Sequence, residues 1–164
     1  MDFIVRQGEE KDMHSVLDLI TELAVFEKEP NAVDISVADL INDGFSENPK
    51  FKIFVAEQED QIIGMALFYE RYSTWKGRSI HLEDLIVTKD KQKKGAGKAL
   101  YTAVLKYAFD HNYNRVAWEV IDWNLNAIDF YKSTGATYLN DWSVVQMNKE
   151  NLAKFIQNTN NEDF

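Results

Sequence analysis

The stretch "KDKQKKGAGKALY", residues 89–101, decides the fold class of this 164-residue chain. It places five lysines and two glycines between the β-branched run "SIHLEDLIVT" (79–88) and an amphipathic segment that reaches about His111. A helix N-terminus presents unpaired backbone N–H groups, and glycines let the backbone approach a ligand closely. The stretch therefore predicts a strand–loop–helix unit with an anion site at the junction. A polar turn with solvated lysines is the alternative.

Two common phosphate-binding motifs do not fit this loop. A P-loop requires Ser or Thr after its Gly-Lys pair, whereas Ala99 follows Gly97 and Lys98 here. The dinucleotide fingerprint requires a third glycine at the position where this chain has Leu100. The local residues therefore leave the polar turn and the anion cradle as open alternatives.

Hydrophobic periodicity along the chain predicts alternating strands and helices. Expected strands cover residues 3–6, 51–57, 61–72, 79–88, 115–121 and 142–148, and expected helices cover 11–27, 36–44, 98–111, 124–134 and 149–158. Three strands in series and one later strand–helix–strand unit indicate an α/β (α+β) fold with a central mixed, mostly antiparallel sheet flanked by helices. The length favours a single domain, residues 1–157, and the polar residues 158–164 are expected to form a disordered tail.

Composition and charge limit the possible functions. The chain contains no cysteine, which excludes disulfides, thiolate metal sites and a cysteine nucleophile. Its net charge of −9 makes non-specific binding of nucleic acid unexpected. No apolar run approaches about 20 residues and no signal-peptide pattern opens the chain, so we expect a cytoplasmic protein without membrane contact. The three histidines lie far apart in the sequence, and no metal site is expected.

Gln92, Gly95 and Gly97 match the signature (Arg/Gln)-x-x-Gly-x-(Gly/Ala), and the chain thereby resembles the GCN5-related N-acetyltransferases (GNAT). Four further segments are similar to the spermidine/spermine acetyltransferase branch: "LAVFEKEP" (23–30), "LINDGF" (40–45), "YSTWKGRSIHLEDLIV" (72–87) and "DWNLNAIDFYKSTGA" (122–136). Within that branch, "STWKGR" is more like the thialysine-acetylating members. The resemblance implies the GNAT fold, whose sheet contains a splayed strand pair, and acetyl-CoA as co-substrate without a metal.

The resemblance assigns the acetyl-CoA contacts to a strand end, the glycine loop and the start of a later helix. Strand residues 85–87 would pair with the pantetheine arm like an added strand, and the loop amides would bind the pyrophosphate. The implied cofactor-binding residues are Leu85, Ile86, Val87, Gln92, Lys93, Lys94, Gly95, Ala96, Gly97, Lys98, Asn124, Asn126, Ala127 and Tyr131. Asn124 is also a good helix N-cap, so capping and cofactor binding are both open for it. Gln92 replaces the commoner arginine of the signature, and Lys93 and Lys94 also depart from closer relatives.

Two residues stand at the catalytic positions of the family. Tyr131 is implied as the acid that protonates the leaving thiolate, since a phenol with a pKa of about 10 stays protonated at pH 7. Glu83 falls at the position of the base, and a water-relayed proton path suits a carboxylate better than direct abstraction. Without the resemblance, Tyr131 is an ordinary helix aromatic and Glu83 and Asp84 form an exposed acid pair. Because neighbours in a strand point to opposite faces, the two acids are expected to have different roles.

The expected acceptor is the primary amine of a small cationic molecule. The substrate-side residues implied by the resemblance are Phe26, Glu27, Trp75, Glu83 and Asp84. An aromatic face suits an aliphatic ammonium, so Trp75 is expected to wall the acceptor site, and a dimer contact is the equal alternative.

Two substrate classes and two other function classes stay open. Ser73 replaces an acid of the polyamine-specific members and favours thialysine or a lysine-like amino acid, whereas Glu27 and Asp84 favour a diamine or polyamine. The resemblance also implies a homodimer and direct attack of the amine in a ternary complex. The alternatives are a non-catalytic acyl-CoA-binding or interaction module and a nucleotide-dependent enzyme.

Overall fold

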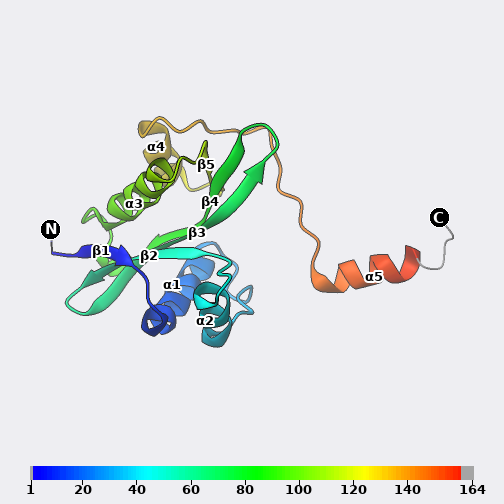
Figure 1. Ribbon diagram of the computed structural model, residues 1–164, viewed down its shortest axis with the longest axis horizontal. Helices are drawn as coiled ribbons and strands as arrows, with labels where there is room; N and C mark the ends of the chain where they lie inside the picture. Colours follow the sequence, from blue (N-terminus) through cyan, green and yellow to red (C-terminus); the bar gives the residue numbers. More distant parts are fainter. Residues whose placement is uncertain (1, 160–164) are drawn as a thin grey trace. The chain divides into compact units, whose positions relative to one another are not determined.

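A five-stranded sheet organises the computed structural model, which describes residues 2–159 (Figure 1). Its strands follow the chain order β1 (Ile4–Gln7), β2 (Lys52–Gln58), β3 (Gln61–Ser73), β4 (Gly77–Val87) and β5 (Val116–Ala117). The first three pairs of neighbours are antiparallel and the last is parallel. Glu59 and Asp60 join β2 to β3 with φ of 50° and 59°, the left-handed pair that a tight two-residue hairpin requires. The predicted mixed, mostly antiparallel sheet is confirmed.

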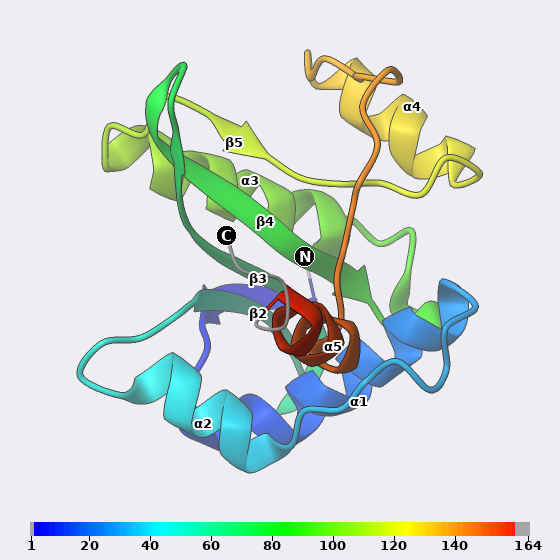
Figure 2. The ribbon, with the colours of Figure 1, turned by 90° about the vertical axis from the view of Figure 1, so that its right-hand side faces the viewer.

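Helices cover both faces of this sheet (Figure 2). The helices α1 (Met13–Phe26) and α2 (Val37–Phe45) lie on one face, and α3 (Ala96–Asp110) lies on the other. The predicted N-cap Ser36 is confirmed, because its Oγ accepts from the Asp39 amide while the Asp39 carboxylate accepts from the Ser36 amide. Two short 3₁₀ turns, η1 (Glu10–Asp12) and η2 (Lys89–Lys91), precede α1 and follow β4.

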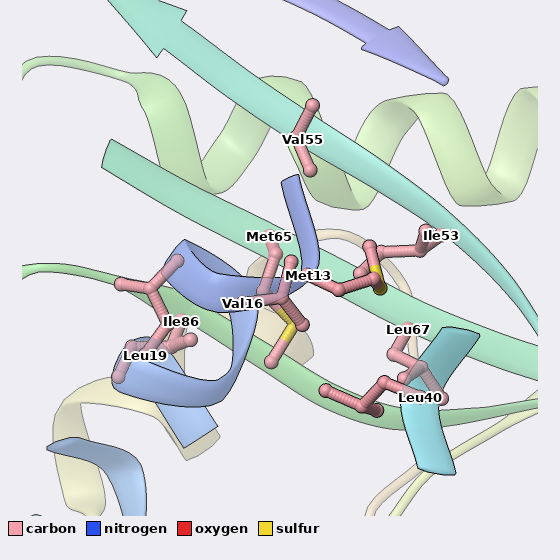
Figure 3. Close-up of a cluster of buried hydrophobic side chains, with 9 residues drawn as sticks. All are labelled: Met13, Val16, Leu19, Leu40, Ile53, Val55, Met65, Leu67 and Ile86. Carbon is pink, nitrogen blue, oxygen red and sulfur yellow. The ribbon is translucent and has the colours of Figure 1, made fainter. Parts of the chain in front are cut away.

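A cluster of buried apolar side chains fills the core between α1, α2 and the sheet (Figure 3). Its buried members are Met13, Val16, Leu19, Leu40, Ile53, Val55, Met65, Leu67 and Ile86. On the α3 face, Phe54 and Phe68 stack with ring centroids 5.4 Å apart, and Phe68 lies 5.1 Å from Tyr107 of α3. These two layers pack on opposite faces of β3 and β4, and both strands carry candidate site residues.

The chain divides into two compact units, Met1–Ile121 and Asp122–Phe164, so the expected single domain stays a prediction. The second unit contains α4 (Leu125–Ser133) and α5 (Lys149–Thr159). Gly135 follows α4 with φ of 90°, as expected of a helix-ending glycine. Helix α5 extends two residues into the predicted tail, and residues 160–164 lie outside the described part of the chain.

Two strand predictions are wrong in extent or in kind. Residues 115–121 were expected to form one strand, but β5 contains only Val116 and Ala117. Residues 142–148 were expected to form another, but no strand is present there. Alternating apolar side chains are not sufficient for a strand, because its backbone groups also need a ladder partner.

Candidate active site

One edge of β4 lacks a paired strand over its C-terminal half. Within residues 2–159, β5 pairs with β4 only at Ile80 and His81. The Thr88 amide donates to β3 at 2.9 Å, so by strand alternation the backbone polar groups of Leu85 and Val87 point away from β3. The short pairing agrees with the expected splayed strand pair. It leaves an edge to which an extended, hydrogen-bonding ligand can add.

The glycine loop connects this edge to the N-terminus of α3. Gly95 is the N-cap of α3 and has φ of 91°. The Gln92 side chain donates from Nε2 to the Val87 carbonyl at 3.0 Å, which ties the loop back to the strand. The first helical bond runs from the Ala99 amide to the Gly95 carbonyl at 3.0 Å. The amides of residues 96–98 belong to the first turn, where they have no helical acceptor and lie at the positive end of the helix dipole.

The side chains of the loop differ in what they can offer an anion. Lys93, Lys94 and Lys98 are exposed, and Lys93 holds a left-handed backbone with φ of 63°. Ala96 is buried as a whole residue, so it offers an anion no side-chain group. A Cβ added at Gly95 would have no neighbour within 4 Å, so this glycine faces open space. The loop thus combines positive charge with an unobstructed backbone, as an anion site requires.

We predict opposite stability effects for alanine at the two loop glycines. Gly95→Ala forces an L-residue into the left-handed region and is expected to destabilise the fold by about 1 kcal/mol. Gly97→Ala lies inside α3, and its Cβ would meet Val87 Cγ2 at 3.7 Å, an ordinary contact. This matched control is expected to be neutral or to stabilise by about 0.5–1 kcal/mol. Urea unfolding measures both, and equal destabilisation would contradict the loop conformation.

The two acids of β4 point to the same face of the sheet. Phe68 of β3 pairs with Leu82, and its neighbour Leu67 pairs with Asp84, so Glu83 is an extra residue in a β-bulge. Leu67 belongs to the core under α1, which places Asp84 on that side. The expectation that Glu83 and Asp84 point to opposite faces is therefore wrong, because a bulge sets two residues of one strand opposite one residue of its neighbour.

Glu83 lies against two side chains on the same face. The Tyr69 hydroxyl donates to Glu83 Oε2 at 2.8 Å, and His81 Nε2 lies 3.5 Å from the same oxygen. Burial raises the pKa of Tyr69 to about 12, and the hydrogen bond to Glu83 contributes to this rise. Tyr69 therefore remains a hydrogen-bond donor at neutral pH. The Glu83 side chain keeps about half of its surface exposed, so it remains accessible to a substrate.

Asp84 and Glu27 complete an acidic cluster on this face. Burial, together with the negative charges of Glu83 and Glu27, raises the pKa of Asp84 to about 6. Burial also raises the pKa of Glu27, at the C-terminal end of α1. Three interacting carboxylates favour a bound cation, because an ammonium among them removes their mutual repulsion. The structure thus brings together three of the predicted substrate-side acids.

The predicted aromatic residues of the acceptor site are exposed. Trp75, in the β3–β4 turn, is 79% exposed, and Phe26, at the end of α1, is 51% exposed. Ser73 is buried at the start of that turn, where its Oγ accepts hydrogen bonds from the amides of Trp75 and Lys76. The Ser73 hydroxyl therefore shapes the turn that carries Trp75.

The remaining predicted residues belong to the second unit. Asn124 Oδ1 accepts from the Ala127 amide at 3.3 Å, which confirms that Asn124 caps α4. Asn126 is exposed in the first turn of α4. Tyr131 is half-buried one turn later, with its ring centroid 5.4 Å from that of Phe130. Asn124 thus serves as the helix cap, and Asn126 exposes its amide side chain in the first turn of the helix.

Sequence reasoning missed three features of the site. Tyr69 and His81 were not predicted, although they are a cross-strand pair and the strand register alone would have put them beside each other. Gln92 was predicted as a cofactor contact only, but its side chain also closes the loop onto Val87.

Among residues 2–159, no group of three or more His, Cys, Asp or Glu is arranged to hold a metal ion. No helix in the same part of the chain is long and apolar enough to cross a membrane.

Similarity searches agree with this geometry. The fold is shared with solved structures: an integron cassette protein from V. cholerae has a TM-score of 0.77 at 24% identity and covers 96% of this chain and 99% of its own. An aminoglycoside acetyltransferase from a soil metagenome has a TM-score of 0.74 at 22% identity, covering 90% and 96% of the two chains. Residues 13–136 match the Acetyltransferase (GNAT) family, and the chain therefore belongs to that family of acetyltransferases, whose members use acetyl-CoA.

Three relatives that are at least 33% identical are named as acetyltransferases or as acetyltransferase-like. The thialysine N-epsilon-acetyltransferase of Bos taurus is 38% identical over 146 residues, which cover 84% of this chain and 86% of that protein. The spermidine/spermine N(1)-acetyltransferase-like protein 1 of Homo sapiens is 34% identical over 160 residues, which cover 92% of this chain but 23% of that longer protein. The L-ornithine N5-acetyltransferase of Arabidopsis thaliana is 33% identical over 109 residues, covering 65% and 48% of the two chains.

Proposed function

We propose that this acetyltransferase transfers the acetyl group of acetyl-CoA to a primary amine of a small cationic molecule. The observation that carries the proposal is the acidic cluster of Glu27, Glu83 and Asp84 on one face of the sheet. On the neighbouring strand edge and loop, exposed amides and lysines suit an anionic donor. A site for an anionic donor and a cationic acceptor needs this separation of charge.

We propose direct transfer within a ternary complex, with the following roles for the main predicted residues. Acetyl-CoA supplies the activated thioester that the amine attacks. The amides of residues 96–98 bind the pyrophosphate, and the free edge of Leu85–Val87 pairs with the pantetheine arm. Glu83 accepts the proton of the substrate ammonium through water, and Tyr131 protonates the leaving thiolate. Asn126 contacts the cofactor from the start of α4.

The acceptor is a lysine-like amino acid, such as thialysine, or a diamine or polyamine. The names of the relatives support both classes, since they include thialysine, ornithine and spermidine/spermine enzymes. Steady-state rates with thialysine, lysine, putrescine and spermidine, measured side by side, distinguish the two. A clear preference for one class identifies the acceptor. Equal, barely detectable rates with all four would refute both.

A non-catalytic acyl-CoA-binding module and a nucleotide-dependent enzyme are tested by the same thermal-shift experiment. Ligands that bind only the native state raise the melting temperature. At a ligand concentration of a hundred times Kd, the free energy of unfolding increases by about 2.7 kcal/mol. We expect acetyl-CoA to stabilise the protein while ATP and NAD do not. Stabilisation by acetyl-CoA without turnover of any amine would favour the binding module instead.

Homodimerisation remains a prediction from the family resemblance, and a cytoplasmic location remains a prediction from the sequence pattern. We propose that Trp75, which is 79% exposed, lies either in the acceptor site or in the dimer contact. Light scattering coupled to size-exclusion chromatography gives the mass in solution. A Trp75→Ala variant that becomes monomeric would assign the residue to the contact, and one that stays dimeric with a raised KM for the amine would assign it to the acceptor site.

A further inference from the structure

Three donors, the exposed Arg71, the buried His81 and the half-buried Tyr69, lie in contact on the sheet next to Glu83. The Tyr69 hydroxyl donates to Glu83 Oε2 at 2.8 Å. His81, which is 7% exposed, contacts both Glu83 and Arg71. Its Nε2 lies 3.5 Å from Glu83 Oε2, and its Nδ1 lies 3.4 Å from Arg71 Nη1. Tyr69 and Arg71 come from β3 and His81 and Glu83 from β4, so the sheet register fixes all four.

The contact with Arg71 determines which nitrogen of His81 carries the proton. A guanidinium has only donors, so His81 Nδ1 must be the acceptor. The proton of the neutral ring then resides on Nε2, which faces Glu83. The Tyr69 hydroxyl thus donates to Oε2, and the Nε2–H of His81 lies beside the same oxygen, with Nε2 3.5 Å from it. About half of the Glu83 side chain is exposed, which leaves room for a water at its other oxygen, Oε1.

We propose that Tyr69, His81 and Arg71 are positioning residues that hold Glu83 Oε2, so that Oε1 is presented to the water that relays the proton of the acceptor amine. The inference rests on the proposed function of Glu83. A carboxylate on a strand has free rotation about its side-chain bonds, and two converging donors restrict it to one orientation. Glu83 shares a face with His81, two residues before it, and with Tyr69, the cross-strand partner of His81, and the bulge adds Asp84 to that face.

Other ionisable groups surround the same carboxylate. Tyr69, His81 and Asp84 interact with Glu83 itself. Glu27 from α1 acts on Asp84, and Arg71 from β3 and Glu119 after β5 act on Tyr69. The negative charge of Asp84 repels Glu83, whereas Tyr69 and His81 hold it. Loss of a donor should therefore release the carboxylate from the site rather than merely weaken the fold.

Tyr69→Phe and His81→Phe test the proposal in the full-length chain. We expect each to lower kcat by about tenfold, to leave the KM for acetyl-CoA unchanged, and to move the acidic limb of the pH–rate profile. His81→Gln restores a donor at about the position of Nε2 and is expected to recover most of the rate. Tyr72→Phe, on the same strand and 74% exposed, is the matched control and should behave like the wild type. Unchanged kcat and pH profile in both Phe variants would overturn the proposal.

A second measurement is independent of activity. Nitrogen-15 chemical shifts of the histidine rings report which nitrogen carries the proton, and the His81→Gln variant assigns the His81 signals among the three histidines. The expected result is the Nε2–H form in the wild type and a mixture of forms in Arg71→Met. A wild-type His81 that carries its proton on Nδ1 would overturn the proposal, whatever amine the enzyme accepts. Absence of turnover with every amine, in contrast, would refute the proposed function and not this arrangement.

Discussion

Tyr131→Phe is expected to lower kcat by at least about a hundredfold, because proton transfer by a positioned acid typically contributes a factor of about 10²–10⁴. Loss of the coenzyme A thiolate is aided by a proton, and phenylalanine cannot supply one. The ring itself is kept, so its packing beside Phe130 on α4 should persist. The KM for acetyl-CoA should therefore change by less than about threefold. Steady-state kinetics with the preferred amine, together with calorimetry of coenzyme A binding, measure the two effects separately.

Tyr138→Phe provides the control for the loss of a tyrosine hydroxyl in the same unit. Tyr138 is exposed, and the Lys132 ammonium lies 5.0 Å from its ring centroid, a contact that phenylalanine preserves. We expect this variant to have wild-type kinetics. If Tyr131→Phe retains the full rate, Tyr131 is not the acid. If coenzyme A binding is lost together with the rate, Tyr131 acts in binding instead.

Asp84→Asn is expected to stabilise the free protein at pH 8 by about 2–3 kcal/mol. Burial, with Glu83 and Glu27 nearby, raises the pKa of Asp84 to about 6 from the ordinary 3.8. Because the folded-state pKa is raised, the carboxyl imposes no penalty below about pH 4, and stability is lost as the pH rises towards and past 6. The difference between the two pKa values corresponds to a loss of at most about 3 kcal/mol in the free energy of unfolding. Asparagine removes the charge, so the gain should vanish at pH 4.

The same substitution is expected to impair the acceptor site. We expect the KM for the amine to rise by about tenfold or more while the KM for acetyl-CoA is unchanged, since one of three clustered negative charges is lost. Asp18→Asn, at an exposed position of α1, is the matched control and should change neither stability nor KM. Urea unfolding at pH 4 and pH 8 and kinetics with the amine are the measurements. A stability gain that is equal at both pH values, or an unchanged KM for the amine, would contradict the role of the cluster.

Much of the fold follows from local sequence signals. The alternation in residues 51–57 and 61–72, the polar pair Glu59–Asp60 between them and the capping residue Ser36 are interactions of neighbouring residues, and the structure confirms each. Gly95 similarly marks the junction of β4 and α3, because only glycine adopts its φ without strain. The strand predicted at residues 142–148 is absent, because strand formation also requires pairing with a partner distant in the sequence.

The sequence by itself determined the strand–loop–helix unit at residues 79–111, the cap of α2 and the acids that belong to the candidate site. These depend on backbone preferences and on hydrogen bonds between residues a few positions apart. The tertiary structure alone decided that Glu83 and Asp84 share a face, that Tyr69 and His81 lie against Glu83, and that Arg71 contacts His81. The physical reason for the shared face is the bulge between β3 and β4. One extra residue reverses the strand alternation, and whether it occurs depends on how two strands align across the sheet.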